Sequence, residues 1–165
     1  MAVVMNDTLA RSFDLLENVI FLKKTPLFSA VQTSELRAIA AIVETIVVEA
    51  GDDLVKESDA GDCLYVIKEG TVRITKKTID NKKIDLAELG EGECFGEMAL
   101  FDDEARSASA SAQTRCSVIR VKRDDLFDVI SEYPTIAIEL LKIFVKRLRK
   151  SNVRIEANAK TDHAQ

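Results

Sequence analysis

The stretch that decides the fold reads FGEMALFDDEARSA and runs from Phe95 to Ala108. Over its whole length it fits neither the period of two of a β-strand nor the period of 3.6 of a helix. Gly96 lets the backbone approach a ligand closely, and the next residues favour a one-turn helix whose free N–H groups can face an anion. Arg106 adds a planar guanidinium that matches two phosphate oxygens, and Ser107 adds a hydroxyl. The stretch therefore predicts a phosphate site.

Glu97 lies on the same loop as these predicted phosphate ligands. A carboxylate beside a phosphate is useful when it accepts a hydrogen bond from another group, such as a sugar hydroxyl. The alternative is a mutual ion pair of Glu97 and Arg106 that pins a surface loop. The ordered set of glycine, glutamate, short helix, arginine and serine favours the ligand site, and points to a phosphate joined to a ribose. The acidic run Asp102–Glu104 is expected to be solvated and to repel an anion weakly.

The glycines divide the rest of the chain into three parts. All six lie between residues 51 and 96, and the flanking segments have none. Because glycine suits tight turns and weakens helix interiors, this split predicts helices, then a compact β region, then helices. Periodicity and capping residues predict helices over residues 8–22, 36–42, 124–130 and 134–155. Short β-branched runs predict strands over residues 45–48, 63–68, 71–77, 84–89, 108–112 and 117–121.

These elements predict an α+β fold that is mainly β. Its centre is an antiparallel double-stranded β-helix, or jelly-roll barrel, flanked by N-terminal helices and two C-terminal helices. The expected parts are an N-terminal helical segment (1–42), the barrel (43–122) with the phosphate-binding stretch (95–108), lid or dimer helices (123–155) and a disordered tail (156–165). All belong to one domain, as the length of 165 residues suggests.

Composition limits the classes of protein that fit. The three cysteines, Cys63, Cys94 and Cys116, are odd in number and lie in apolar runs, so we expect small core residues in a reducing compartment rather than disulfides. The sequence has no apolar run of membrane-spanning length and no secretory signal, which favours a cytoplasmic protein without membrane contact. A net charge of −5 disfavours sequence-independent binding to nucleic acid.

The segment from Phe95 to Ala108 resembles the phosphate-binding cassette of the cyclic-nucleotide-binding domain family. That family includes bacterial catabolite-activator regulators, regulatory subunits of cAMP-dependent kinase, and nucleotide-gated channels. The resemblance extends from about residue 22 to residue 152 and includes Glu49–Asp52 and Leu64–Val72. One departure is Ala105, where many members have a proline before the arginine; its loss is expected to loosen the loop without removing a ligand contact.

The resemblance implies a ligand site on the cassette, and through it a set of residue roles. Glu97 would accept from the ribose 2′-hydroxyl, and Arg106 would bind the equatorial phosphate oxygen. The implied ligand residues are Phe95, Gly96, Glu97, Met98, Ala99, Arg106, Ser107 and Ala108.

The base contacts are implied by weaker alignments. Leu86 and Ala87 match positions that wall the base, and Ser151 and Asn152 match positions on the last helix that approach it. The similarity of Ser151 and Asn152 to a cAMP-binding pattern favours cAMP over cGMP as the ligand.

The expected function is that of a non-catalytic sensor without cofactor or metal. It binds a cyclic mononucleotide and transmits binding through movement of its C-terminal helices to an unknown effector domain or protein. Apolar residues over 136–155 suggest a homodimer through the long helix. Only about ten residues follow that helix, so this sequence is not expected to read DNA, and it can be complete or part of a longer protein.

Other functions stay open at this point. The barrel could bind cGMP or a cyclic dinucleotide, or act as an adaptor that has lost its ligand. A cupin-type enzyme would share the barrel shape, but it needs two or three histidines around a metal. The chain has one, His163, in the expected tail.

Overall fold

The computed structural model describes the backbone of residues 2–162, with side chains described for residues 9–146, 148 and 149. In chain order, its elements are α1 (Ala2–Lys24), α2 (Thr33–Ile42), β1 (Glu44–Val48), β2 (Asp53–Val55), β3 (Cys63–Glu69), β4 (Val72–Lys77), β5 (Lys83–Leu89), β6 (Cys94–Phe95), the 3-10 turn η1 (Met98–Leu100), β7 (Ser109–Ala112), β8 (Cys116–Lys122), α3 (Arg123–Glu132) and α4 (Thr135–Asp162).

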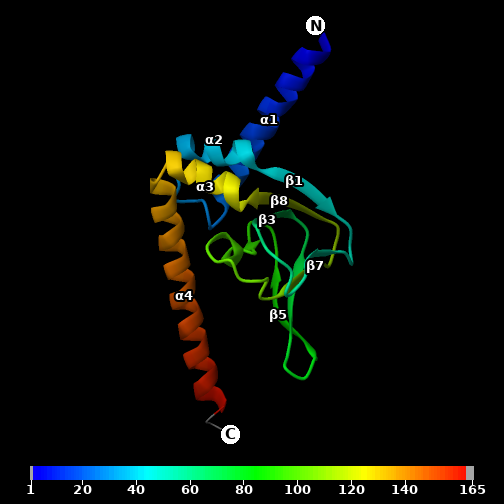
Figure 1. The fold of residues 1–165 in the computed structure, drawn as a ribbon, viewed down its shortest axis with the longest axis vertical. Helices are drawn as coiled ribbons and strands as arrows, with labels where there is room; N and C mark the ends of the chain where they lie inside the picture. The colour runs from blue at the N-terminus through cyan, green and yellow to red at the C-terminus, as the bar shows by residue number, and fades with distance from the viewer. Residues whose placement is uncertain (1, 163–165) are drawn as a thin grey trace.

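The strands form two four-stranded antiparallel sheets. The first has the order β1-β8-β3-β6, and the second has the order β2-β7-β4-β5. Helices α2 and α3 lie together over one end of the strands, while α1 and α4 extend away from the body in different directions (Figure 1). The β4–β5 hairpin projects from the strands on the side toward which α4 runs (Figure 1).

Strand β3 shows why the apolar run after residue 62 is almost unbroken. Cys63, Tyr65 and Ile67 pack in the core that also contains residues of the second sheet. Leu64 and Val66 pack with the helices on the opposite face. Because successive strand residues point to opposite faces, a strand buried on both sides needs apolar residues throughout. The first sheet is therefore the middle layer, between the helices and the second sheet.

The helices share one core on the outer face of this middle layer. Leu22 of α1, Leu36 of α2, Leu126 of α3 and Leu140 of α4 are all nearly inaccessible to water within it. Glu35 of α2 accepts hydrogen bonds from the Gln32 backbone N–H at 3.1 Å and from the Thr135 hydroxyl. The start of α4 is thereby held against the start of α2.

The predicted mixture of helices and antiparallel strands is confirmed. The structure adds two strands that the sequence did not predict, β2 and β6, which contain three and two residues. Helix α1 begins earlier than predicted, and α4 continues to Asp162 rather than ending near Ile155, into the segment expected to be a tail. Strand pairs within residues 2–162 form two separate sheets, so closure into a jelly-roll barrel stays a prediction.

The three cysteines are free and buried, as expected for core residues. Among residues 2–162, none of the helices combines the length and the apolar character that crossing a bilayer requires.

Candidate functional site

A cavity of about 510 Å³ opens between the second sheet and the stretch from β6 to the start of β7. Strands β2, β4 and β5 supply the aliphatic side chains Val55, Ile74, Leu86 and Leu89, and the loop supplies most of the polar groups. The other lining residues are Glu93, Cys94, Phe95, Gly96, Glu97, Met98, Ala99, Asp102, Glu104, Ala105, Arg106, Ser107, Ala108, Ser109 and Ala110. One wall is thus apolar and the other polar, which suits a ligand with a flat apolar part and a charged part.

All eight residues predicted to bind ligand through the cassette line this cavity. Of the predicted base-wall residues, Leu86 lines the cavity and Ala87 does not. The register of β4 and β5 shifts after Ile74, which pairs with Ala87, while Thr75 pairs with Asp85. Leu86 is therefore the extra residue of a β-bulge, and bulges redirect side chains. The other predicted base contacts, at positions 151 and 152, lie outside the residues whose side chains are described.

Gly96 forms the tight start of the loop. Its φ of +77° is one that residues with a side chain rarely adopt, and a Cβ there would lie 2.6 Å from Nη1 of Arg106 and 3.0 Å from the Cys63 carbonyl oxygen. The turn η1 follows, with Ala99 and Leu100 buried beneath it and Met98 exposed. The buried pair anchors the turn, whose residues Met98 and Ala99 line the cavity.

Arg106 is the central polar group of the site. Only 8% of the residue is exposed. Its Nη1 donates to the Gly96 carbonyl at 3.1 Å, and its Nη2 donates to the Cys63 carbonyl at 2.9 Å. Its guanidinium also lies 5.9 Å from the centre of the Tyr65 ring, which stacks on Phe95. These partners are neutral, and no described residue forms an ion pair with Arg106. The expected alternative, an ion pair with Glu97, is not formed.

The backbone around Arg106 is held by the turn between β2 and β3. The Arg106 N–H donates to the Asp59 carbonyl at 2.8 Å, and the Ser58 N–H donates to the Arg106 carbonyl at 2.9 Å. Next to this pair, the Glu57 N–H donates to the Ser109 hydroxyl at 2.9 Å. The main chain therefore fixes the position from which the guanidinium starts.

Two neighbouring groups respond to the charge at this site. The pKa of the Asp62 carboxyl is lowered, first by a hydrogen bond from the Cys63 thiol at 3.0 Å and to a smaller extent by the positive charges of Arg106 and Arg120. Burial, followed by the effect of Asp62, raises the pKa of the Cys63 thiol to about 11. The thiol is therefore protonated at neutral pH, which makes it a poor nucleophile.

Arg123 ties the cassette to α3, and sequence reasoning missed this link. Its guanidinium donates to the carbonyl of Ala99, to the Asp102 carbonyl at 2.6 Å and to the Gly61 carbonyl at 3.1 Å. It also pairs with the Asp103 carboxylate at 2.6 Å, and that side chain is 97% exposed, as expected for a solvated acidic run. Because Arg123 is the first residue of α3, the helix starts against the loop that lines the cavity.

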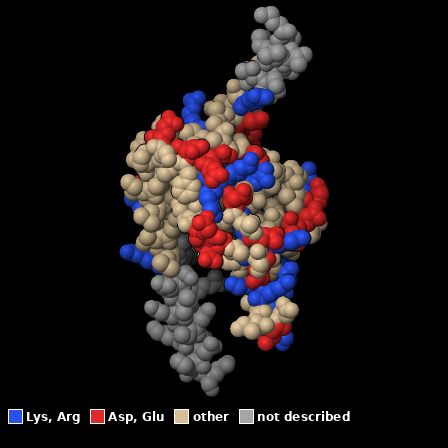
Figure 2. Space-filling view, in the orientation of Figure 1, with Lys and Arg blue, Asp and Glu red and all other residues tan. Residues whose placement is uncertain are grey.

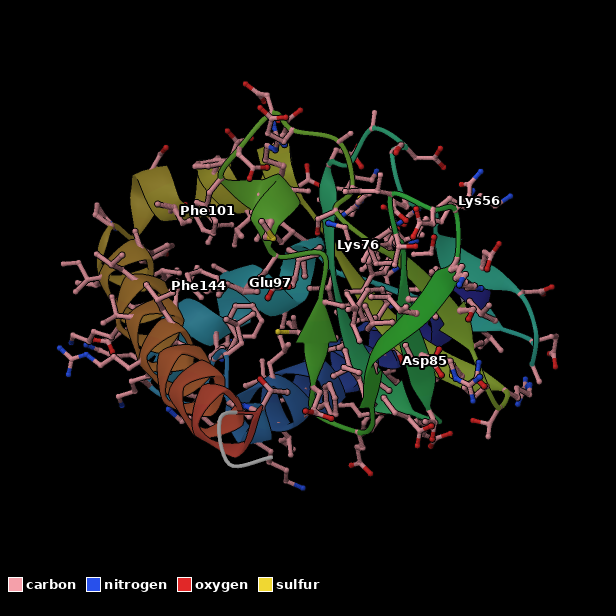
Figure 3. All side chains as sticks on the ribbon, turned by 90° about the horizontal axis from the view of Figure 1, so that it is seen from below. Lys56, Lys76, Asp85, Glu97, Phe101 and Phe144 are labelled. Atoms are coloured by element: carbon pink, nitrogen blue, oxygen red, sulfur yellow. The ribbon has the colours of Figure 1, made fainter. Side chains whose placement is uncertain are left out.

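An aromatic cluster makes a second connection between the cassette and the C-terminal helices. Phe101 follows η1 and lies edge-on to Phe127 of α3, with ring centres 6.2 Å apart, and to Phe144 of α4, with ring centres 5.4 Å apart. Figure 3 shows Phe101 and Phe144 at the side where α4 passes the cassette. Phe144 is half-buried and also packs on the helical core. Its contact with Phe101 joins the predicted lid helix to the loop that lines the cavity.

The cavity presents polar groups of both charges. The cavity presents one buried cation, a carboxylate on Glu97 and a hydroxyl on Ser107, which now makes only a long contact of 3.7 Å with the Met98 sulfur. Glu93, another lining carboxylate, accepts from the Gly90 N–H at 2.9 Å. Within the part of the chain whose side chains are described, no three His, Cys, Asp or Glu residues come together as metal ligands would.

Comparison with known proteins gives the family. The sequence profile of the cyclic nucleotide-binding domain matches residues 45–133. The chain is 30% identical over 131 residues to a CRP-like cAMP-activated global transcriptional regulator of Mycobacterium tuberculosis, covering 79% of this chain and 58% of the regulator. It is 34% identical over 104 residues to a cAMP-dependent protein kinase regulatory subunit of Emericella nidulans, covering 63% of this chain and 24% of the subunit.

A solved structure agrees with these matches. The Thermus thermophilus catabolite activator protein superposes with a TM-score of 0.73 at 29% identity, covering 82% of this chain and 63% of that protein. The chain therefore belongs to the cyclic nucleotide-binding domain family. It spans less than two thirds of the length of these relatives.

Gly61 gives a test of the geometry around Arg106. A Cβ at this residue would lie 2.4 Å from Nε of Arg106, whereas a Cβ at Gly90 would meet nothing within 4 Å. We expect Gly61→Ala to displace the guanidinium and to lower cyclic nucleotide affinity by about tenfold or more, equivalent to roughly 1.4 kcal/mol. Gly90→Ala should bind normally. Calorimetric titration of both variants measures the difference, and equal affinities would contradict the geometry.

Proposed function

We propose that this chain is a non-catalytic sensor that binds cAMP and reports its binding through α3 and α4. The observation that carries the proposal is the guanidinium of Arg106, a buried positive charge whose hydrogen-bond partners are neutral carbonyls in the wall of a 510 Å³ cavity. A buried charge is costly unless an opposite charge lies beside it. The single negative charge of a cyclic phosphate supplies that partner.

The lining of the cavity favours a mononucleotide over a dinucleotide. Arg106 is the one cationic side chain among the described lining residues, and four carboxylates, those of Glu93, Glu97, Asp102 and Glu104, line the cavity as well. A cyclic dinucleotide would bring a second phosphate with no cation to meet it. The aliphatic wall of β2, β4 and β5 would receive the base.

The preference for cAMP is supported by relatives. The regulator of Mycobacterium tuberculosis is named as cAMP-activated, and the subunit of Emericella nidulans belongs to a cAMP-dependent kinase. Both are regulators, which agrees with a non-catalytic role. We extend their ligand to this chain as part of the proposal, together with the roles of Glu97 on the ribose and Arg106 on the phosphate.

The contacts of the cassette suggest how binding would reach the helices. A phosphate at Arg106 and η1 would shift the loop, and η1 is joined to α3 by Arg123 and to α4 by Phe101. Ligand then changes the population of helix positions only if it binds one arrangement more tightly.

Arg106→Leu tests the phosphate contact. Removal of one partner of a charge-assisted contact should weaken cAMP binding by about 2–5 kcal/mol. Arg115→Leu is the matched control, because Arg115 is exposed and pairs with Glu49 away from the cavity. Calorimetric titrations with cAMP and, separately, with cGMP measure both the affinity and the base preference. Near-normal binding by the Arg106 variant would refute the site, and tighter binding of cGMP would correct the ligand.

Glu97→Gln tests the ribose contact with a pair of ligands. We expect this variant to lose affinity for cAMP, but to lose less for 2′-deoxy-cAMP, because the hydroxyl that Glu97 would accept from is missing there. The comparison cancels effects of the substitution on the fold. Equal losses with both ligands would exclude the ribose role of Glu97.

Helix α4 has a stripe of exposed apolar side chains through which the homodimer expected from the sequence could form. Ile138, Leu141, Val145 and Leu148 of α4 are each between 42% and 63% exposed. They follow one another at spacings of three, four and three residues, which is the a/d pattern of helices that pair in coiled coils. We include pairing of two copies through this stripe in the proposal.

Glutamate substitution at Leu141 and Leu148 should abolish this dimer, because two buried like charges would face each other across the helix pair. Lys146→Glu, which lies off the stripe, should leave it intact. Sedimentation equilibrium at micromolar protein, with and without cAMP, measures the mass. A monomeric mass of the unaltered chain in both conditions would exclude the dimer.

A further inference from the structure

The end of the β4–β5 hairpin has a charge opposite to that of the whole chain. Residues 76–83 include the four lysines Lys76, Lys77, Lys82 and Lys83 and one acid, Asp80, which gives a local charge of +3 in a chain of net charge −5. Figure 2 shows blue atoms gathered on the projecting hairpin, followed by tan atoms and then by red and blue atoms at its end. None of the four lysines forms an ion pair with a described residue.

The loop at the tip is ordered by its own hydrogen bonds. The Thr78 N–H donates to the Lys82 carbonyl at 2.8 Å, and the Lys82 N–H donates to the Thr78 hydroxyl oxygen at 3.1 Å. The Asn81 N–H donates to the Thr78 carbonyl at 2.9 Å. Within this closed loop, Ile79 is completely exposed, at 106% of its reference area. The loop therefore holds an isoleucine exposed to solvent at the turn of the hairpin.

A groove beside the hairpin brings a fifth lysine, Lys56, to the same region. The groove has a volume of about 650 Å³, and Lys56, Lys76, Lys77, Lys83 and Ile79 line it together with acidic and hydroxyl side chains. Figure 3 shows Lys56 on the side of the molecule away from α4. The acids include Asp53, Glu57 and Asp59, so the groove itself is a mixed environment that would repel a small anion as much as attract it.

We infer that the tip of this hairpin docks on a membrane surface rich in anionic lipid. Lysines gain attraction from an anionic bilayer, and an exposed aliphatic side chain gains from entry into the boundary of the acyl chains. Docking of this kind differs from the expectation of no membrane contact, which rested on the lack of a spanning segment and a secretory signal; a docking tip needs neither.

Two other anionic partners fit the tip less well. A single-stranded nucleic acid would use aromatic side chains for stacking, and residues 76–83 have none. An acidic protein would need a complementary concave surface, and it would leave Ile79 without an apolar environment unless that surface also offered an apolar pocket. The lipid surface satisfies the lysines and the isoleucine together.

The experiment is co-sedimentation of the full chain with vesicles, without nucleotide, so that its result does not depend on the proposed function. We expect binding to vesicles of equal parts phosphatidylcholine and phosphatidylserine, and none to phosphatidylcholine alone. Lys82→Gln with Lys83→Gln should lower partition by roughly twenty-fivefold, at about fivefold for each lysine. Ile79→Ser should lower it several-fold, and Ile79→Leu should preserve it.

The matched control removes the same charge elsewhere. Lys142→Gln with Lys146→Gln, on α4, should leave vesicle binding nearly unchanged. Equal losses in the two double variants would show that binding follows net charge, and would overturn the assignment to the tip.

Absence of binding to the anionic vesicles, or an Ile79→Ser variant that binds like the unaltered chain, would overturn docking by insertion. Binding to polyuridylate but not to vesicles would identify a nucleic-acid surface instead. Unchanged circular dichroism of each variant confirms that the fold is retained.

Discussion

The guanidinium of Arg106 is a positive charge held almost entirely out of water, and the surrounding structure is arranged to accept it. Two main-chain carbonyls receive its N–H groups, and the face of Tyr65 lies beside it. Moving an ion from water into a protein interior opposes folding by several kcal/mol unless hydrogen bonds and an opposite charge compensate. The carbonyls supply the hydrogen bonds, and the neighbouring cavity is the place where the opposite charge would come from. The stability of this region and the ligand binding proposed above would therefore depend on the same electrostatic arrangement.

A second arginine, Arg123, is also held by main-chain carbonyls, and it connects the loop at the cavity to the helices. Arg123 also directs its N–H groups at carbonyl oxygens, and one of them belongs to Gly61, the residue whose missing side chain leaves room for Arg106. Gly61 thus lies between the two guanidiniums. In the function proposed above, a displacement of Arg106 would reach the first residue of α3 directly, and the ring contact of Phe101 with Phe144 would connect the same loop to α4. The connection from Arg106 to α3 and α4 therefore consists of a few backbone contacts and one aromatic cluster.

Much of this arrangement could be predicted from the sequence, because local patterns decide it. The glycine distribution and β-branched runs gave the order of helices and strands, and the cassette residues appeared around one cavity because they lie on one continuous loop. What could not be predicted depends on distant pairing. Strand β6 has two residues and exists only because Phe95 and Cys94 pair with β3. Leu86 lines the cavity because the pairing of β4 and β5 has a bulge after Ile74. Arg123 connects α3 to the cassette because it bonds to a loop that lies more than twenty residues earlier in the chain.

The use of carbonyl oxygens as acceptors for Arg106 has an evolutionary consequence. Every residue has a carbonyl, so substitution of the side chain at position 63 leaves that acceptor in place. The arginine can therefore keep its orientation while the sequence around it drifts, provided that the path of the main chain is conserved. Variation is restricted instead at Gly61 and Gly96, where an added carbon would collide with the guanidinium. Relatives could thus diverge widely over the core and still hold the guanidinium in the same place, with two glycines and one arginine as the residues that change least.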